Sequence, residues 1–178
     1  MRTRNRGLWI LLLVTTCSIA SADPTVSPAV AWGPARDGLQ AGVSVREGKR
    51  TFRAGELLTV QLQVRNTGTQ PRPLTYFMGI LDDLAPAVED AAGKKLDVVM
   101  PPFELNKRQN ADETIKPGQT LEIGAVKLVF RESVEDDPVN LPTVRAGAGK
   151  ARLGYAGFAV SDRALATGKL ELEITRGR

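Results

Sequence analysis

The fold is decided by the stretch Ala54-Gly55-Glu56-Leu57-Leu58-Thr59-Val60-Gln61-Leu62-Gln63-Val64-Arg65-Asn66-Thr67-Gly68. It begins with a Gly turn, ends with an Asn-Thr-Gly turn, and between the turns apolar residues alternate with polar ones. A period of two places successive side chains on opposite faces of a strand. The stretch therefore predicts a strand with one buried row, made of Leu58, Val60, Leu62 and Val64, and one polar row on the other face.

The rest of the chain repeats this design between Gly, Pro and Asn turns. Alternating apolar residues recur in the segments 39–45, 121–130, 151–155 and 170–174, and no segment has the spacing of an amphipathic helix. Short strands with frequent turns are typical of an Ig-like sandwich. The sequence therefore predicts an all-β fold, an Ig-like antiparallel β-sandwich of about seven to eight strands.

One strand is expected to contain an irregularity. In the segment 121–130 the apolar residues stand at odd positions up to Ile123 and at even positions from Val126 onwards. One extra residue between these halves would return both apolar sets to the same face of the strand. We therefore predict a β-bulge near Gly124.

Several connections can also be predicted. The segments 86–90 and 95–100 flank turn-forming residues and indicate a hairpin. Residues 101–113 contain two Pro and several charges, which favours a long loop, and the stretch after Tyr155 is rich in turn-forming residues. Pro and Gly occupy the central positions of Lys116-Pro117-Gly118-Gln119, the composition of a type II turn.

The N-terminus has the three parts of a secretory signal peptide. Three Arg lie within the first six residues, an apolar run follows from Leu8 to Val14, and small residues end in Ala20-Ser21-Ala22. The apolar run is much shorter than the roughly 20 residues that a membrane-spanning helix needs. We therefore predict cleavage after Ala22, a periplasmic or secreted location, and no membrane span in the exported chain.

Cys17 leaves one alternative open. Val14-Thr15-Thr16-Cys17 resembles a bacterial lipoprotein box, although Thr16 stands where Gly, Ala or Ser is usual. A lipid on Cys17 is therefore the alternative to simple cleavage. After cleavage, residues 23–38, rich in Pro, Ala and Gly, would form an extended lead-in to a single sandwich domain at residues 39–178.

The charge balance argues against a nucleic-acid partner. The whole chain has 24 Lys plus Arg and 20 Asp plus Glu. Cleavage removes three Arg and no acid, which leaves 21 basic against 20 acidic residues. Because the remaining charges are interspersed, the sequence predicts no nucleic-acid role.

The composition excludes several kinds of site. The chain has no His, and its only Cys, Cys17, leaves with the signal peptide. This excludes a Ser-His-Asp triad, a Cys nucleophile and a zinc site with His or Cys ligands. The acids Asp82-Asp83 and the group from Glu132 to Asp137 are interpreted as solvated loop charge, with calcium binding by the second group as an alternative. We therefore predict a protein that is not an enzyme and has no cofactor or metal.

The strands and turns carry a series of short motifs. In chain order they are Trp32-Gly33-Pro34, Gly38-Leu39-Gln40, Phe52-Arg53-Ala54-Gly55-Glu56, Val64-Arg65-Asn66, Lys116-Pro117-Gly118 and Leu165-Ala166-Thr167-Gly168-Lys169-Leu170. This series resembles bacterial secreted Ig-like domain proteins of unknown function. More distantly, residues 51–155 resemble the intracellular proteinase inhibitor domain of bacilli, with Gly149-Lys150-Ala151 where such sandwiches often have Gly-x-Tyr.

The leading hypothesis is an exported, non-enzymatic Ig-like binding or interaction module of the bacterial cell envelope, with a protein or another envelope component as partner. The alternative is a secreted protease inhibitor that presents a loop. Binding residues often lie on loops at the ends of such sandwiches. The loop 101–113 combines the aromatic Phe103 with the cations Lys107 and Arg108, a composition typical of a contact hot spot. We therefore predict Phe103, Lys107 and Arg108 as binding residues.

Trp32 has two interpretations. It is the only Trp that remains after cleavage, and a Trp side chain buries more area than most others. The favoured interpretation is that it caps one end of the core. The alternative is an exposed residue that stacks on a ligand.

Overall fold

The computed structural model describes residues 29–46, 48–77, 84–102, 110–133 and 141–177. Within these ranges the chain forms strands and turns and contains no helix, so the predicted all-β class is confirmed. The described part holds fourteen strands, more than predicted, because several strands have only two or three residues. The predicted signal peptide, Cys17 included, lies outside the described residues.

The chain forms its strands in the order β1 to β14. Their bounds are β1 (Ala31–Trp32), β2 (Leu39–Val45), β3 (Thr51–Arg53), β4 (Leu57–Asn66), β5 (Arg72–Phe77), β6 (Ala87–Asp90), β7 (Val98–Val99), β8 (Asn110–Ile115), β9 (Thr120–Arg131), β10 (Thr143–Arg145), β11 (Gly149–Gly154), β12 (Phe158–Val160), β13 (Arg163–Leu165) and β14 (Leu170–Thr175).

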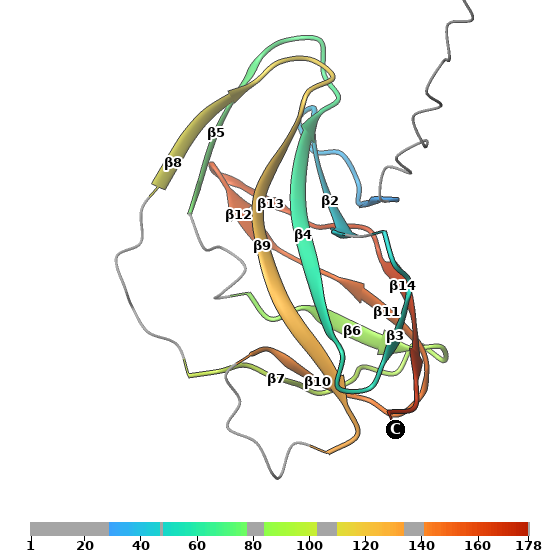
Figure 1. Cartoon of the computed structure of the whole chain (residues 1–178). Helices are drawn as coiled ribbons and strands as arrows, with labels where there is room; N and C mark the ends of the chain where they lie inside the picture. The colour runs from blue at the N-terminus through green and yellow to red at the C-terminus, as the bar shows by residue number, and fades with distance from the viewer. Residues whose placement is uncertain (1–28, 47, 78–83, 103–109, 134–140, 178) are drawn as a thin grey trace, which may run out of the picture.

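The larger sheet has six strands in the order β1-β2-β4-β9-β10-β7, and β4 and β9 are its long, curved members (Figure 1). β4 pairs antiparallel with β2 on one side and with β9 on the other. Its apolar row is buried as predicted, with Leu58, Val60, Leu62 and Val64 at most 1% exposed. Gln61, on the opposite face, is also largely buried because its amide donates to Glu122 Oε2 at 2.8 Å.

A second sheet of four strands, in the order β3-β14-β11-β6, covers the inner face of the first (Figure 1). The predicted rows Ala151 and Leu153 of β11, and Leu170, Leu172 and Ile174 of β14, all point into the core. Residues from both sheets form one hydrophobic cluster. The described part of the protein is therefore a sandwich-like all-β fold. Burying a side chain of this size contributes about 1.5–3 kcal/mol to stability.

Two further sheets have two strands each, and in both places the sequence prediction was wrong. β5 pairs antiparallel with β8, so residues 110–113 belong to a strand rather than to the predicted long loop. β12 and β13 form a hairpin in the stretch after Tyr155 that was predicted to be turns. Their apolar residues, such as Phe158 and Leu165, are buried in the main core, and this burial stabilises strands too short to show a clear period in the sequence.

The predicted irregularity in β9 is confirmed. Leu62 of β4 pairs with Gly124, but the next residue, Gln63, pairs with Glu122. Ile123 is therefore the extra residue of a β-bulge. The bulge lets Ile123 and Val126 both reach the core, where they are 4% and 8% exposed. The type II turn is also present, with Gly118 at φ 76° and a hydrogen bond of 3.0 Å from the Gln119 N–H to the Lys116 carbonyl.

The predicted hairpin of segments 86–90 and 95–100 is only partly correct. Its turn is closed by the Asp90 N–H, which donates to the Lys94 carbonyl at 2.9 Å, and the Leu96 N–H donates to the Val88 carbonyl at 2.9 Å. Beyond Leu96 the chain leaves β6, and β7 pairs with β10 of the larger sheet. The reason is burial, because Val98 packs against the shared core from that other sheet.

The motifs that carried the family resemblance lie at joints between segments. A Cβ on Gly33 would stand 2.0 Å from the Ala166 carbonyl oxygen, and a Cβ on Gly168 would stand 2.6 Å from the Trp32 oxygen. Only glycine allows these two backbones to touch. At another joint the buried Asn66 side chain donates to the carbonyls of Gln70 at 2.7 Å and Ile115 at 2.9 Å. These motifs therefore have a structural role in closing the sandwich.

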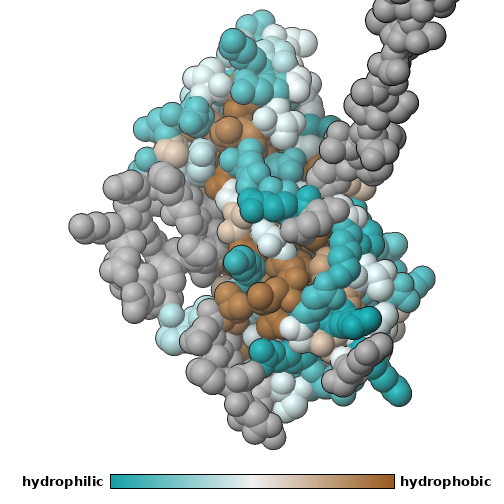
Figure 2. All heavy atoms as spheres, viewed as in Figure 1, coloured by the Kyte–Doolittle hydropathy of each residue, from teal (hydrophilic) through white to brown (hydrophobic). Residues whose placement is uncertain are grey.

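The outer face of the larger sheet is apolar near one end. Leu57, Val129, Thr143 and Val99 stand side by side across four strands, and Leu57 is 53% exposed. Figure 2 shows hydrophobic atoms at the surface over the lower part of β4 and β9.

Candidate binding site at the open edge of β14

β14 is paired along nearly its whole length on one side, but along only part of its length on the other. Toward β11 its register runs from Leu170 to Ile174, but toward β3 it covers only Glu173 to Thr175. The Glu173 N–H donates to the Arg50 carbonyl at 2.8 Å on the β3 side. Backbone groups alternate between the two sides of a strand, so the N–H of Glu171 points to the β3 side as well. No strand of the described chain lies beside Glu171 there.

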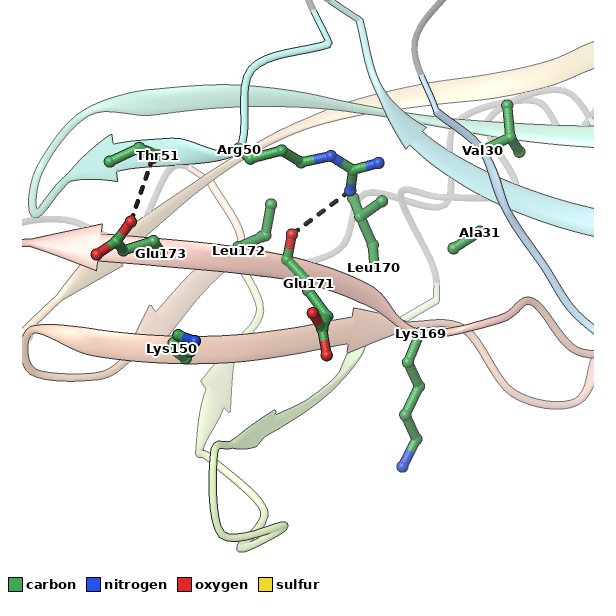
Figure 3. A pocket seen from close by; sticks show the side chains of 10 residues that line it. All are labelled: Val30, Ala31, Arg50, Thr51, Lys150, Lys169, Leu170, Glu171, Leu172 and Glu173. Atoms are coloured by element: carbon green, nitrogen blue, oxygen red, sulfur yellow. Dashed lines mark hydrogen bonds between the residues drawn. The ribbon is translucent and has the colours of Figure 1, made fainter.

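A pocket of about 460 Å³ lies along this open half of the edge. Figure 3 shows that β14 forms its floor, that the start of β3 and the segment before β1 stand on either side, and that β11 lies beyond. Its lining residues are Val30, Ala31, Arg50, Thr51, Lys150, Lys169, Leu170, Glu171, Leu172 and Glu173.

The side chain of Arg50 extends from the start of β3 along the opening, toward Val30 and Ala31 (Figure 3). Its Nη2 donates to the Ala29 carbonyl at 2.6 Å, and its Nη1 donates to the Glu171 carbonyl at the long distance of 3.5 Å. Partial burial lowers the pKa of Arg50, and the nearby Glu171 carboxylate opposes that shift. The guanidinium stays protonated at neutral pH because an Arg pKa lies far above 7.

The other charged residues of the pocket divide into paired and unpaired groups. Lys169 lies 2.6 Å from Glu89, and Glu171 lies 3.7 Å from Arg152. Arg50 and Lys150 have no carboxylate within ion-pair distance in the described part of the chain. The charges without an ion pair among these residues are thus the cation Arg50 beside the open edge, the cation Lys150 on β11, and the carboxylate of Glu173, whose Oε2 accepts from the Thr51 hydroxyl at 3.5 Å. The Arg50 guanidinium and the unpaired strand edge can recognise an anionic group and backbone amides.

The residues predicted from sequence as a binding site cannot be placed beside this pocket. Phe103, Lys107 and Arg108 all lie outside the described residues, and so do residues 134–138 of the acidic loop. The predicted contact residues and the calcium alternative therefore stay predictions.

The favoured interpretation of Trp32 is wrong. The ring lies on the outer face of the larger sheet, where a Cβ on Gly42 would stand 2.5 Å from Trp32 Cε3. The guanidinium carbon of Arg65 lies 4.2 Å from the ring centroid, and Arg65 Nε donates to Gln40 Oε1 at 2.8 Å. Trp32 is thus half-buried in a cation–π stack outside the core, because its neighbour Ala31 takes the inward position.

A second hollow, of about 620 Å³, lies near the C-terminal end of the described chain. Its lining includes Ala54, Glu132, Arg176 and Gly177. It borders residues 134 and 178, which lie outside the described part. The pocket at β14 lies along an unpaired strand edge and is therefore the better candidate.

Sequence reasoning did not find Arg50. It stands in Glu47-Gly48-Lys49-Arg50, whose composition is typical of a turn and indicates no binding role. Its importance comes from the parallel pairing of β3 with β14, two strands more than a hundred residues apart in the chain. The local alternation of apolar residues cannot predict a pairing between segments so far apart in the chain.

Two other kinds of site are absent from the described ranges. No group of three or more His, Cys, Asp or Glu side chains gathers there in a way that could hold a metal ion. No helix among these residues is long and apolar enough to cross a membrane.

Comparison with known proteins does not assign a family. No protein-family model and no curated protein matches the chain at a significant level. The resemblances to secreted Ig-like proteins and to the proteinase inhibitor domain therefore stay expectations.

Proposed function

We propose that the protein is an exported, non-enzymatic binding module with an Ig-like fold, which holds a protein partner in the periplasm or outside the cell. The observation that supports it best is the open half of β14. There an unpaired strand edge, a pocket and the guanidinium of Arg50, which has no carboxylate partner among the described residues, occur together. The unpaired N–H and C=O groups of such an edge are a ready template for pairing with another chain.

Export is the second part of the proposal. The N-terminal sequence has the order of a signal peptide that ends at Ala22. The exported chain then contains neither His nor Cys, and its stability depends on the core shared by the two sheets. A rigid sandwich of this kind suits a scaffold that presents an edge or a loop to a partner.

A cross-linking experiment tests the proposal. Residues 23–178 would be produced with a photoreactive amino acid in place of Thr51, which lines the pocket and is exposed. After irradiation in an envelope extract, we expect one dominant cross-linked protein, identified by mass spectrometry. Its yield should fall at least about tenfold in Arg50→Gln, since losing a charge-assisted hydrogen bond costs about 1.5–3 kcal/mol.

The matched control is Arg145→Gln. Arg145 is an exposed Arg on β10, in the other sheet, 4.0 Å from Asp97. This variant should cross-link as well as the unaltered protein. Absence of any adduct, or equal adducts with Arg50→Gln, would contradict the proposal. A captured protease that the protein inhibits would support the alternative of a protease inhibitor.

A further inference from the structure

The opening beside β14 has the position of a missing strand. β3 runs parallel to β14 but begins only at Thr51, opposite Glu173. Alongside residues 169–172 the line of β3 is continued by the side chain of Arg50, not by backbone (Figure 3). Unpaired N–H and C=O groups at a strand edge pair readily with an extended chain from another molecule.

The two ends of the opening are fixed by hydrogen bonds. At one end the Glu173 N–H donates to the Arg50 carbonyl at 2.8 Å, and at the other the Gly168 N–H donates to the Ala31 carbonyl at 3.1 Å. Between them lie residues 169–172. At about 3.3 Å per residue they offer an edge of roughly 13 Å, enough for an extended segment of about four residues.

The backbone groups of Glu171 are available to such a segment. Among the described residues no strand lies beside its N–H, and its carbonyl accepts only from Arg50 Nη1, at 3.5 Å. A bond of that length is weak. An incoming N–H can replace it at the carbonyl, and an incoming carbonyl can accept the Glu171 N–H.

The charges around the opening indicate what the segment should carry. Arg50, once displaced from the Glu171 carbonyl, still has a positive charge and no carboxylate partner in the described structure. Lys150, on β11, is a second cation without an ion pair among the described residues, and the Glu173 carboxylate of the same pocket accepts from the Thr51 hydroxyl at 3.5 Å. Carboxylates bind a guanidinium through short, charge-assisted hydrogen bonds.

We propose that the open edge of β14 binds an extended peptide segment that carries a carboxylate and adds to the sheet as a short strand beside residues 169–172. This inference rests on the proposed binding function and names the class of partner. Arg50 covers the edge in the free protein and pairs with the carboxylate of the bound segment.

The test uses residues 23–178 labelled with ¹⁵N and synthetic ten-residue peptides as probes. One peptide alternates Thr and Val around a central Asp, a second has Asn in place of Asp, and a third has Pro next to the Asp. We expect the Asp peptide to shift the amide signals of residues 169–172 and to slow hydrogen exchange at the Glu171 amide at least about tenfold. The Asn peptide should bind about tenfold more weakly, and the Pro peptide should bind and protect the amide less, because Pro has no N–H to donate to the Glu171 carbonyl.

The variants separate this inference from the proposed function. Arg50→Gln should bind the Asp and Asn peptides equally, while Arg145→Gln should behave like the unaltered protein. If no peptide changes exchange at Glu171 while cross-linking to the envelope partner still depends on Arg50, strand addition is wrong and the binding function stands. If Arg50→Gln instead forms dimers in sedimentation and the unaltered protein binds no peptide, Arg50 only shields the edge, and the inference also fails.

Discussion

β4 and β14 have the same side-chain pattern but different edges. Both carry a row of alternating apolar residues that is at most 2% exposed, from Leu58 to Val64 in β4 and from Leu170 to Ile174 in β14. β4 is paired with a strand on each side along nearly its whole length, whereas β14 has an unpaired half. The comparison teaches that side-chain period decides which face is buried, and that backbone pairing decides where another chain can bind.

The largest expected effect tests the feature that β4 and β14 share, a buried apolar row. Leu62→Ala in β4 and Leu172→Ala in β14 should each lower the free energy of unfolding by about 2–5 kcal/mol, as for other buried Leu truncations. Gln63→Ala, on the outer face of β4, should cost much less. Denaturant unfolding would measure all three. A small loss for Leu172→Ala, or equal losses for Gln63→Ala and Leu62→Ala, would show that the two rows are not equivalent.

A second prediction tests how firmly β4 is closed at its end. Asn66→Ala removes the donors to the Gln70 and Ile115 carbonyls and the acceptor of the Gly68 N–H. Because Asn66 is only 1% exposed, we expect a loss of about 2–3 kcal/mol in thermal or denaturant unfolding. Thr67→Ala, which removes an exposed hydroxyl, is the control and should change stability little. A neutral Asn66→Ala would mean that this corner is not a structural closure.

A third prediction concerns the strand next to β14. Tyr155 follows β11 and is 2% exposed, and its hydroxyl has no hydrogen-bond partner among the described residues. Tyr155→Phe should therefore stabilise the protein, by about 1 kcal/mol, since a buried hydroxyl without a partner costs about 1–3 kcal/mol. A destabilised Phe variant in the same unfolding assay would show that the hydroxyl is bound in solution.

The same residue gives a pH dependence with a definite sign. Burial raises the pKa of Tyr155 in the folded protein, whereas in the unfolded chain it is about 10. Above about pH 10 the phenol ionises in the unfolded chain but stays neutral in the folded protein. The free energy of unfolding therefore falls as the pH rises above about 10. The stability advantage of Tyr155→Phe should thus grow between pH 9 and pH 11, roughly the range around that unfolded value. A constant difference would contradict the assigned burial.

The smallest expected effect on stability belongs to the open edge. Arg50→Gln removes one short bond to Ala29 and one long bond to Glu171, so we expect the free energy of unfolding to change by less than about 1 kcal/mol. Arg50 should matter for binding and not for folding. If Arg50→Gln unfolded the protein as strongly as Leu62→Ala, Arg50 would be a structural residue of the sandwich.

The sequence predicted those parts of the fold that depend on local period. The rows of β2, β4, β11 and β14 and the bulge beside Gly124 follow from the alternation of apolar residues, and the structure confirms them. The path of the chain after Leu96 could not be predicted, because burial of Val98 in the opposite sheet decides it. β8 has no buried apolar row except Ile115, so its polar sequence resembled a loop.

The candidate site could not be predicted from the sequence. Its parts come from Val30, Arg50, Lys150 and the segment 169–173, which only the fold brings together. Trp32 lies on the outer face because its neighbour Ala31 points to the core, and Gly42 only leaves room for the ring. A site made from an unpaired backbone edge leaves no motif, because backbone groups are the same in every residue.

The most direct test of the account is native-state hydrogen exchange at single amides of the free protein. We predict that the Glu171 amide exchanges nearly as fast as an unstructured one, while the neighbouring Leu172 amide, which faces β11, is protected like the amides in the centre of β4. Protection of Glu171 equal to that of Leu172 would show that the edge of β14 is already occupied, and would contradict the open edge as the binding site.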